Sequence, residues 1–298
     1  MNKYTLATAA GLLVAMLGGA AGAQSYPSRP IRMIVPFVPG GSVDFVARII
    51  QPKFSELLGQ QVVIDNRAGA SGNIGTEIAA RAAPDGYTLA MITSQQPNVV
   101  ALFDKLPYDL VKDFAPISLL AAGPLIVVAS ASLKANDLKE LIAQAKAKPE
   151  SITYGSTGVG SLAHLVGAML EQHTGARMLH IPYKGASQSL IDVVSGQVPV
   201  MFSATSVALP FIKQGKLIAL GVPSEKRSPL LPEVPTFEEA GVARLDTSGW
   251  FGILAPAGTP RPILEKVAAD TAQILALPDV TESLRGQGLE PTGLGPDA

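Results

Sequence analysis

The chain lacks cysteine altogether. This absence excludes disulfide bridges, thiolate metal sites, a cysteine nucleophile and the lipidated cysteine that anchors many exported proteins. Charge is also sparse and balanced, because 23 lysines and arginines stand against 24 aspartates and glutamates in 298 residues. Such a chain has no electrostatic attraction to nucleic acid or to an anionic membrane surface.

The first 23 residues have the pattern of an export signal. Lys3 supplies a positive start, Leu6 to Leu17 an apolar run, and Ala21-Gly22-Ala23 a small-residue cleavage site. The apolar run is shorter than the roughly 20 residues that a membrane-spanning helix needs. We therefore expect an exported protein that begins near Gln24 and carries 22 basic and 24 acidic side chains.

The remaining 275 residues exceed the usual single-domain length of about 100–200, which favours two lobes. Short β-branched runs alternate with helix-length segments, the pattern of an α/β fold with mainly parallel sheets. Expected strands are 31–37, 61–64, 87–92, 151–154, 178–181, 198–202, 217–222 and 250–254; expected helices are 43–58, 74–83, 136–148, 162–173, 187–194 and 262–277.

Two segments are expected to cross between the lobes. Phe114 to Ala129 contains two apolar runs broken at Gly123-Pro124, and Trp250 to Leu254 has the pattern of a strand that returns to the first lobe. We expect residues 24–124 and 248–298 to form the first lobe and residues 125–247 the second.

The segment VPFVPGGSVDFVAR, residues 35–48, predicts a strand, a glycine turn and a helix start. Free N–H groups and the helix dipole at such a start attract anions, and paired glycines let a ligand come close. Gly40, Gly41 and Ser42 are therefore candidates for binding a carboxylate. The alternative is an ordinary capped turn in which Asp44 offsets the dipole.

A similar pattern occurs in YGSTGVGSLAHLVGAMLE, residues 154–171, where Ser161 can cap a helix and His164 lies one turn further on. His164 is equally well explained as a hydrogen-bonded structural residue. Gly158, Gly160 and Ala163 match the spacing of a dinucleotide fingerprint, but the next strand lacks the acidic residue that would hold a ribose. No nucleophile elbow, phosphate loop or zinc-binding helix motif is present in the sequence, and we expect no cofactor and no metal.

Loops that follow other expected strands supply further candidates for the walls of a cleft. They are residues 66–73, Thr93 to Gln96, and Pro182 to Ser187. Phe37 ends the first strand and is suited either to cover the apolar part of a ligand or to pack in the core.

Five ordered motifs resemble one known family: VPFVPGGSVDFVAR, IDNRAGASGNIG, PDGYTL, YGSTGVGSLAH and HIPYKGASQSLIDVVSGQV. The chain resembles, from about Tyr26 to its end, the substrate-binding receptors of tripartite tricarboxylate transporters, often called Bug receptors. The resemblance implies a two-lobed, type II-like periplasmic binding fold, each lobe a mainly parallel sheet flanked by helices, with a ligand cleft between the lobes.

The resemblance also implies ligand-binding positions. Those carried over by motif are Phe37, Gly40, Gly41, Ser42, Asp44, Thr157, Ser161, His164 and Ala186; Ser94 and Ser203 are added from loop position. Relatives usually continue past a segment like Pro291 to Ala298 into a further helix, which makes this chain a candidate fragment.

We expect, on this resemblance, a monomeric periplasmic receptor that captures a small carboxylate and delivers it to integral membrane transporter subunits. One alternative is a receptor whose closed form docks on a sensor protein. Another is an exported enzyme, for which only the glycine-rich turns argue.

Overall fold

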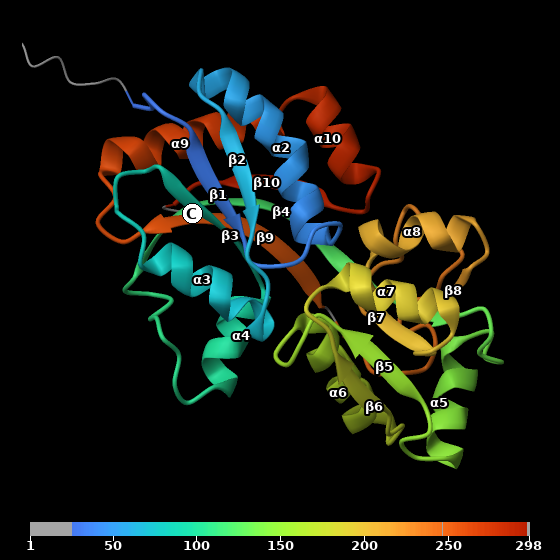
Figure 1. The fold of residues 1–298 in the computed structure, drawn as a ribbon. Coiled ribbons are helices and arrows are strands. Elements are labelled where there is room, and N and C mark those ends of the chain that lie inside the picture. The colour runs from blue at the N-terminus through green and yellow to red at the C-terminus, as the bar shows by residue number, and fades with distance from the viewer. Residues whose placement is uncertain (1–25, 246, 297–298) are drawn as a thin grey trace, which may run out of the picture.

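The structure is a computed structural model that describes residues 26–245 and 247–296. The expected export signal lies outside the described residues. The chain forms two lobes, each a mixed β-sheet flanked by helices (Figure 1).

The first lobe is built around three parallel strands, in the order β2 (Val62–Asn66), β1 (Ile31–Val35) and β3 (Thr88–Thr93). β9 (Ser248–Pro256) lies antiparallel between β3 and β4, and β10 (Glu290–Leu294) pairs antiparallel with β4. The helices of this lobe are α2 (Ser42–Leu58), α3 (Asn73–Ala80), α4 (Gln95–Leu102), α9 (Arg261–Leu275) and α10 (Pro278–Arg285), with a 3₁₀ turn η1 (Ala70–Gly72).

The second lobe repeats this plan on a smaller scale. β5 (Thr153–Ser156) lies parallel between β6 (Leu179–Pro182) and β7 (Val200–Ala204), while β8 (Leu217–Gly221) pairs with β4. Its helices are α5 (Leu138–Ala147), α6 (Leu162–Thr174), α7 (Ala186–Ser195) and α8 (Thr205–Lys213).

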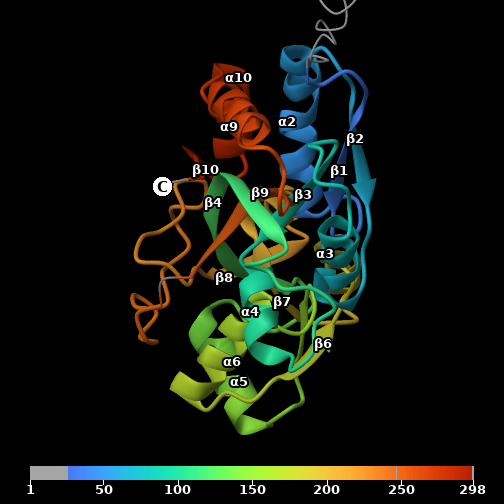
Figure 2. The same cartoon turned by 90° about the vertical axis from the view of Figure 1, so that its left-hand side faces the viewer.

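One long strand, β4 (Phe114–Ser130), belongs to both sheets. Its first part pairs with β9 as far as Pro124, and from Leu125 onward it pairs with β7 and β8. Figure 2 shows β4 running from the upper lobe toward the lower one. The two apolar runs expected to be broken at Gly123-Pro124 are therefore one continuous strand, because each half has a hydrogen-bonding neighbour.

The buried apolar side chains form separate cores for the two sheets. In the first lobe, α2, α9 and α10 pack on one face of the sheet, and Ala79 of α3 packs with Tyr108 and Phe114 on the other. In the second lobe, α5 and α6 cover one face and α7 and α8 the other. The α/β fold with a two-lobed architecture, expected from sequence, is confirmed; the parallel part of each sheet is the part that the βα units build.

Three helices were not expected from sequence: α4, α8 and α10. Pro97 in the first turn of α4 and Pro210 inside α8 obscure the helical pattern, although proline is tolerated in a first turn. Within the described residues, no helix is both long and apolar enough to cross a bilayer.

Candidate ligand-binding site

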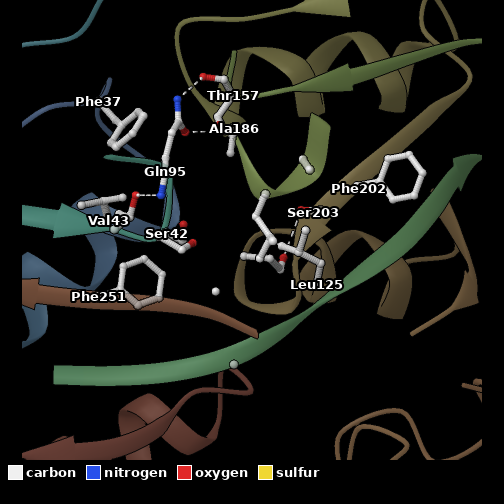
Figure 3. Close-up of a pocket in the computed structure, with 18 of the residues that line it drawn as sticks. Phe37, Ser42, Val43, Gln95, Leu125, Thr157, Ala186, Phe202, Ser203 and Phe251 are labelled. Atoms are coloured by element: carbon white, nitrogen blue, oxygen red, sulfur yellow. Dashed lines mark hydrogen bonds between the residues drawn. The ribbon is translucent and has the colours of Figure 1, made fainter. Parts of the chain in front are cut away.

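A cavity of about 90 Å³ lies where the two lobes meet. Both lobes contribute to its wall, and Figure 3 shows Phe37, Ser42 and Phe251 on one side and Leu125 and Ser203 on the other. The residues that line it are Phe37, Gly41, Ser42, Val43, Thr93, Ser94, Gln95, Gly123, Leu125, Thr157, Leu162, Ala163, Ala186, Met201, Phe202, Ser203, Ala204, Gly249, Trp250, Phe251 and Leu289.

The first lobe presents the start of α2 to this cavity. Gly41 is the N-cap residue and Ser42 the first helical residue, so the helix has no side-chain cap. Gly40 precedes them with a φ of 80°, a left-handed conformation that glycine adopts readily. The first N–H groups of α2 therefore have no partner within the helix, and they lie at the edge of the cavity.

The second lobe presents the start of α7 from the opposite side. Its N-cap is Gly185, again without a side-chain cap, and Ala186 lines the cavity. A methyl group placed on Gly41 would lie 4.0 Å from both the nitrogen and the Cβ of Ala186. Two uncapped helix starts, one from each lobe, thus face each other closely.

Three further helices begin at the same cavity. They contribute Gln95 at the start of α4, Leu162 and Ala163 at the start of α6, and Ala204 as the N-cap of α8. Each helix N-terminus carries a partial positive charge of about half a unit. No residue that lines the cavity is charged, so the field there comes from these backbone dipoles.

Hydrogen bonds and close packing join the two lobes beside the cavity. Thr157 Oγ1 donates a hydrogen bond of 3.0 Å to Gln95 Oε1, and Ser187 Oγ donates one of 3.0 Å to the carbonyl of Pro39. Gly185 also lies against Val38, since a methyl group on Gly185 would come within 2.3 Å of Val38 Cγ2. The structure therefore shows the lobes closed over the cavity.

A family model described as "Tripartite tricarboxylate transporter family receptor" matches residues 46–295. The chain belongs to this family.

Individual relatives agree with the family match. Protein BugT of Bordetella pertussis is 38% identical over 301 residues, which is 100% of this chain and 92% of BugT. The solved structure of the periplasmic binding protein BugD is 35% identical with a TM-score of 0.87, covering 91% of each chain. An R. palustris protein solved with adipate is 34% identical with a TM-score of 0.87, also covering 91% of each chain.

Seven of the positions expected from sequence line the cavity of this family member: Phe37, Gly41, Ser42, Ser94, Thr157, Ala186 and Ser203. They come from five separate loops and strand ends, so closure of the lobes brings them together. Their contact with a ligand stays a prediction.

Gly40 and Asp44 lie beside the cavity and do not line it. The buried Asp44 carboxylate accepts hydrogen bonds from the Gly40 N–H at 3.0 Å, from Arg48 Nε at 2.8 Å and from Asn66 Nδ2 at 3.0 Å. Burial alone would raise the pKa of Asp44, but these three donors outweigh it and lower the pKa. Asp44 therefore stabilises the glycine turn through its hydrogen bond with the Gly40 N–H.

Ser161 and His164 also lie outside the residues that line the cavity. Ser161 Oγ accepts a hydrogen bond from the His164 N–H and so caps α6. The His164 ring stacks on His180 with centroids 4.2 Å apart, and His180 Nε2 lies 2.6 Å from Ser156 Oγ. Burial lowers the pKa of His164; burial and the neighbouring His164 together lower the pKa of His180 to about 4.

Many residues that line the cavity were not among the site positions expected from sequence, and Gln95, Leu125 and Phe251 are examples. Gln95 lies in the loop from Thr93 to Gln96 that was expected to line a cleft; its side chain accepts a hydrogen bond from Thr157 of the other lobe and donates one to the carbonyl of Ser71 in its own lobe. Leu125 and Phe251 belong to apolar strand segments and could not be told apart from core residues.

Proposed function

We propose that this protein is a periplasmic solute-binding receptor that captures a small carboxylate between its lobes and delivers it to an integral membrane transporter of the tripartite tricarboxylate class. The observation that carries this proposal is the uncharged cavity ringed by five helix starts. Backbone N–H groups at helix starts bind carboxylates without a cationic side chain.

Contacts between the closed lobes also support this function. A ligand held between the starts of α2 and α7 contacts both lobes at once, so it favours closure by the difference in its affinity for the closed and open forms. The closed form presents one continuous surface drawn from both lobes, which a membrane partner can distinguish from the open form.

We base the proposed lobe boundaries on the pairing of β4 and on the separate hydrophobic cores. We place the first lobe at residues 24–124 and 248–298 and the second at residues 125–247, because β4 changes its pairing partners at Leu125 and the two cores do not mix. The adipate-bound relative supports a carboxylate as the ligand class, and BugD supports a periplasmic location. We infer a monomer that binds and releases its ligand without chemical change.

A thermal-shift screen of residues 24–298 tests this function. Candidate ligands are mono-, di- and tricarboxylates, with the corresponding primary amides as uncharged controls of matched shape. A ligand at 100 times its dissociation constant stabilises the folded state by about 2.7 kcal/mol, which a melting curve resolves. Calorimetry then measures the affinity of each hit; the absence of both a shift and a binding heat for every acid would overturn the proposal.

A further inference from the structure

A second hollow adjoins the ligand cavity where β4 passes between the lobes. This hinge groove of about 720 Å³ is lined by residues 122–124 of β4, residues 224–230 of the second lobe, and Ser248, Arg285, Gly286, Gly288, Leu289 and Glu290. Among the described residues, Gly123 and Leu289 line both the groove and the cavity. These two residues therefore form the partition between the small cavity and the larger groove.

Leu289 supplies the side chain of this partition, since Gly123 has none. A methyl group on Gly123 would lie 2.4 Å from the carbonyl oxygen of Gly288, so the backbones approach too closely for a larger residue. The same methyl position is 2.9 Å from Leu289 Cδ2, which places the leucine side chain against the Gly123 backbone. The partition is therefore as thick as one leucine side chain.

Two sets of backbone hydrogen bonds hold Leu289 in this place. β10 pairs antiparallel with β4 so that Glu290 lies opposite Ala122, which brings Leu289 opposite Gly123. The Leu289 N–H also donates a hydrogen bond of 2.9 Å to the carbonyl of Leu284 in α10. The backbone of Leu289 therefore cannot move away from the cavity without loss of these bonds.

The closed cavity leaves a ligand little room to extend in other directions. Each water needs roughly 10–15 Å³ by the same measure, so a cavity of about 90 Å³ has room for on the order of six to nine waters. At the mouth, Thr157 is bonded to Gln95 and Ser187 to the carbonyl of Pro39, so a ligand that extended there would break contacts between the lobes. Extension past Leu289 would leave these contacts intact.

The hinge groove suits the polar end of a longer ligand. Its wall carries the cations Lys226, Arg227 and Arg285 as well as the acids Glu225 and Glu290, and Arg285 is paired with Glu290 at 2.6 Å. All five of these residues are exposed to solvent. A charged group that reached the groove would keep its contact with water and would avoid the cost of burying a charge.

We propose that Leu289 is a specificity-determining residue, because its side chain ends the cavity at the hinge groove and sets the greatest ligand length over which the lobes can close. This inference rests on the proposed function, since it concerns the same cavity. Without the leucine side chain, the cavity and the groove join, and the far end of a longer ligand passes between them while the lobes stay closed.

A series of ligands of increasing length tests the inference by calorimetry on residues 24–298. The probes are the unbranched mono- and dicarboxylates with four to ten carbons. In the wild type we expect affinity to fall by about tenfold or more from the best-binding member of a series to its ten-carbon member. In Leu289→Ala we expect the same ratio to shrink to about threefold or less, because the longer chain enters the groove.

Two further variants separate a longer cavity from a looser fold. Leu284→Ala removes a fully buried leucine of α10 from the same core, at a position that does not line the cavity, and should keep the wild-type ratio. Leu289→Val removes a single methylene and should change the ratio in the same direction as Leu289→Ala but by less. Far-ultraviolet circular dichroism checks the fold of each variant, and Leu289→Val carries the test if Leu289→Ala does not fold.

The outcomes distinguish the inference from the function on which it rests. An unchanged ratio in the folded Leu289 variants overturns the inference, as does a wild type that binds all lengths equally or a ratio that shrinks as much in Leu284→Ala as in Leu289→Ala. Each of these results leaves the receptor function standing. The absence of binding for every acid in the wild type overturns the receptor function itself.

Discussion

The two glycine-rich turns look alike in sequence and are used differently in the structure. In the first lobe, helix α2 begins at Ser42 with Gly41 as its cap, so the Ser42 hydroxyl is not used to cap the helix. In the second lobe, Ser161 is itself the cap of α6, and its hydroxyl is bound to the His164 N–H. A shift of one residue in where the helix begins therefore decides whether a serine faces the cavity or completes its own helix.

The second lobe presents a different helix start without a side-chain cap, that of α7, to the cavity. The loop before α7 ends at Gly185, leaves the helix uncapped and brings Ala186 opposite Gly41. The starts of α2 and α7, which have no side-chain cap, thus face each other at the cavity, whereas the start of α6 is capped by Ser161.

The largest effect is expected at Gly185. Gly185→Ala places a methyl group 2.3 Å from Val38 Cγ2 of the other lobe, while the φ of 177° at Gly185 is open to any residue. We expect the free energy of ligand binding to weaken by roughly 2–3 kcal/mol, about thirty- to a hundred-and-fiftyfold in affinity, because the lobes cannot close fully.

Two variants control for this result in the same calorimetric measurement. Adding Val38→Ala removes the clashing methyl group and should restore affinity, and Gly295→Ala, where a methyl group meets nothing within 4 Å, should leave affinity unchanged. Wild-type affinity in the Gly185→Ala variant would show that closure at this point is not needed for binding.

At Ser42 the expected effect is on binding and not on stability. Ser42→Ala should weaken carboxylate binding by about 1.5–2 kcal/mol, roughly ten- to thirtyfold, as expected for loss of a hydrogen bond to a charged group. The melting temperature should stay the same because Gly41, not Ser42, caps the helix. Ser195→Ala, at an exposed serine of α7, is the control; unchanged affinity in Ser42→Ala would remove this hydroxyl from the site.

The histidine pair beneath the second turn should make stability depend on pH. The pKa of His180 falls from 6.5 to about 4 in the folded state, so below pH 6.5 the unfolded chain binds a proton that the folded protein does not. Stability therefore decreases as pH falls from 6.5 to 4, by on the order of 1–2 kcal/mol after allowance for the partial exposure of the ring.

Denaturant unfolding of His180→Gln between pH 7 and pH 4 measures this contribution. The variant should lose less stability over that range than the wild type. His173→Gln changes an exposed histidine of α6 and should keep the wild-type dependence. Identical pH profiles for the wild type and His180→Gln would rule out the stacked pair as the cause.

Ser161 should show the reverse of Ser42, and the smallest effect. Ser161→Ala removes the cap of α6 and should cost about 1 kcal/mol of unfolding free energy, with affinity changed by less than about twofold. Ser161→Asn keeps a capping side chain and should recover most of that stability. A large loss of affinity at unchanged stability would place the Ser161 hydroxyl in the ligand site and erase the contrast between the two turns.

Local signals in the sequence carried much of the fold and part of the site. Ser42 and Ser161 mark the starts of α2 and α6 within one residue, although the N-cap of α2 is Gly41, and the apolar runs mark β1, β3, β5 and β7. What local signals could not supply is pairing between distant segments. β4 was expected as two pieces because a Gly-Pro step interrupts it, and only its neighbours β9, β7 and β8 make it one strand.

The binding site, too, could be predicted where local signals mark it and not where distant segments meet. Ser42 and Ala186 follow glycine turns and could be predicted, and so could the loop that contains Gln95, whereas the 3.0 Å hydrogen bond from Thr157 to Gln95 joins distant segments that no local signal pairs. Nothing in the sequence indicates that Leu125 and Phe251 line the cavity, because an apolar residue in a strand has the same sequence pattern whether it packs in the core or contacts a ligand.

The continuous strand β4 also has a mechanical meaning. One strand is hydrogen-bonded into both sheets, so the lobes can move apart when β4 bends near Pro124. Its pairing with β9 before that point and with β7 after it is kept. A bent strand of this kind is elastic and resists opening only weakly. The contacts of Thr157, Ser187 and Gly185 between the lobes hold the closed form instead. The dissociation rate of a captured ligand would then be set by these contacts between the lobes, so that substitutions at Thr157, Ser187 or Gly185 change release without changing the flexibility of β4.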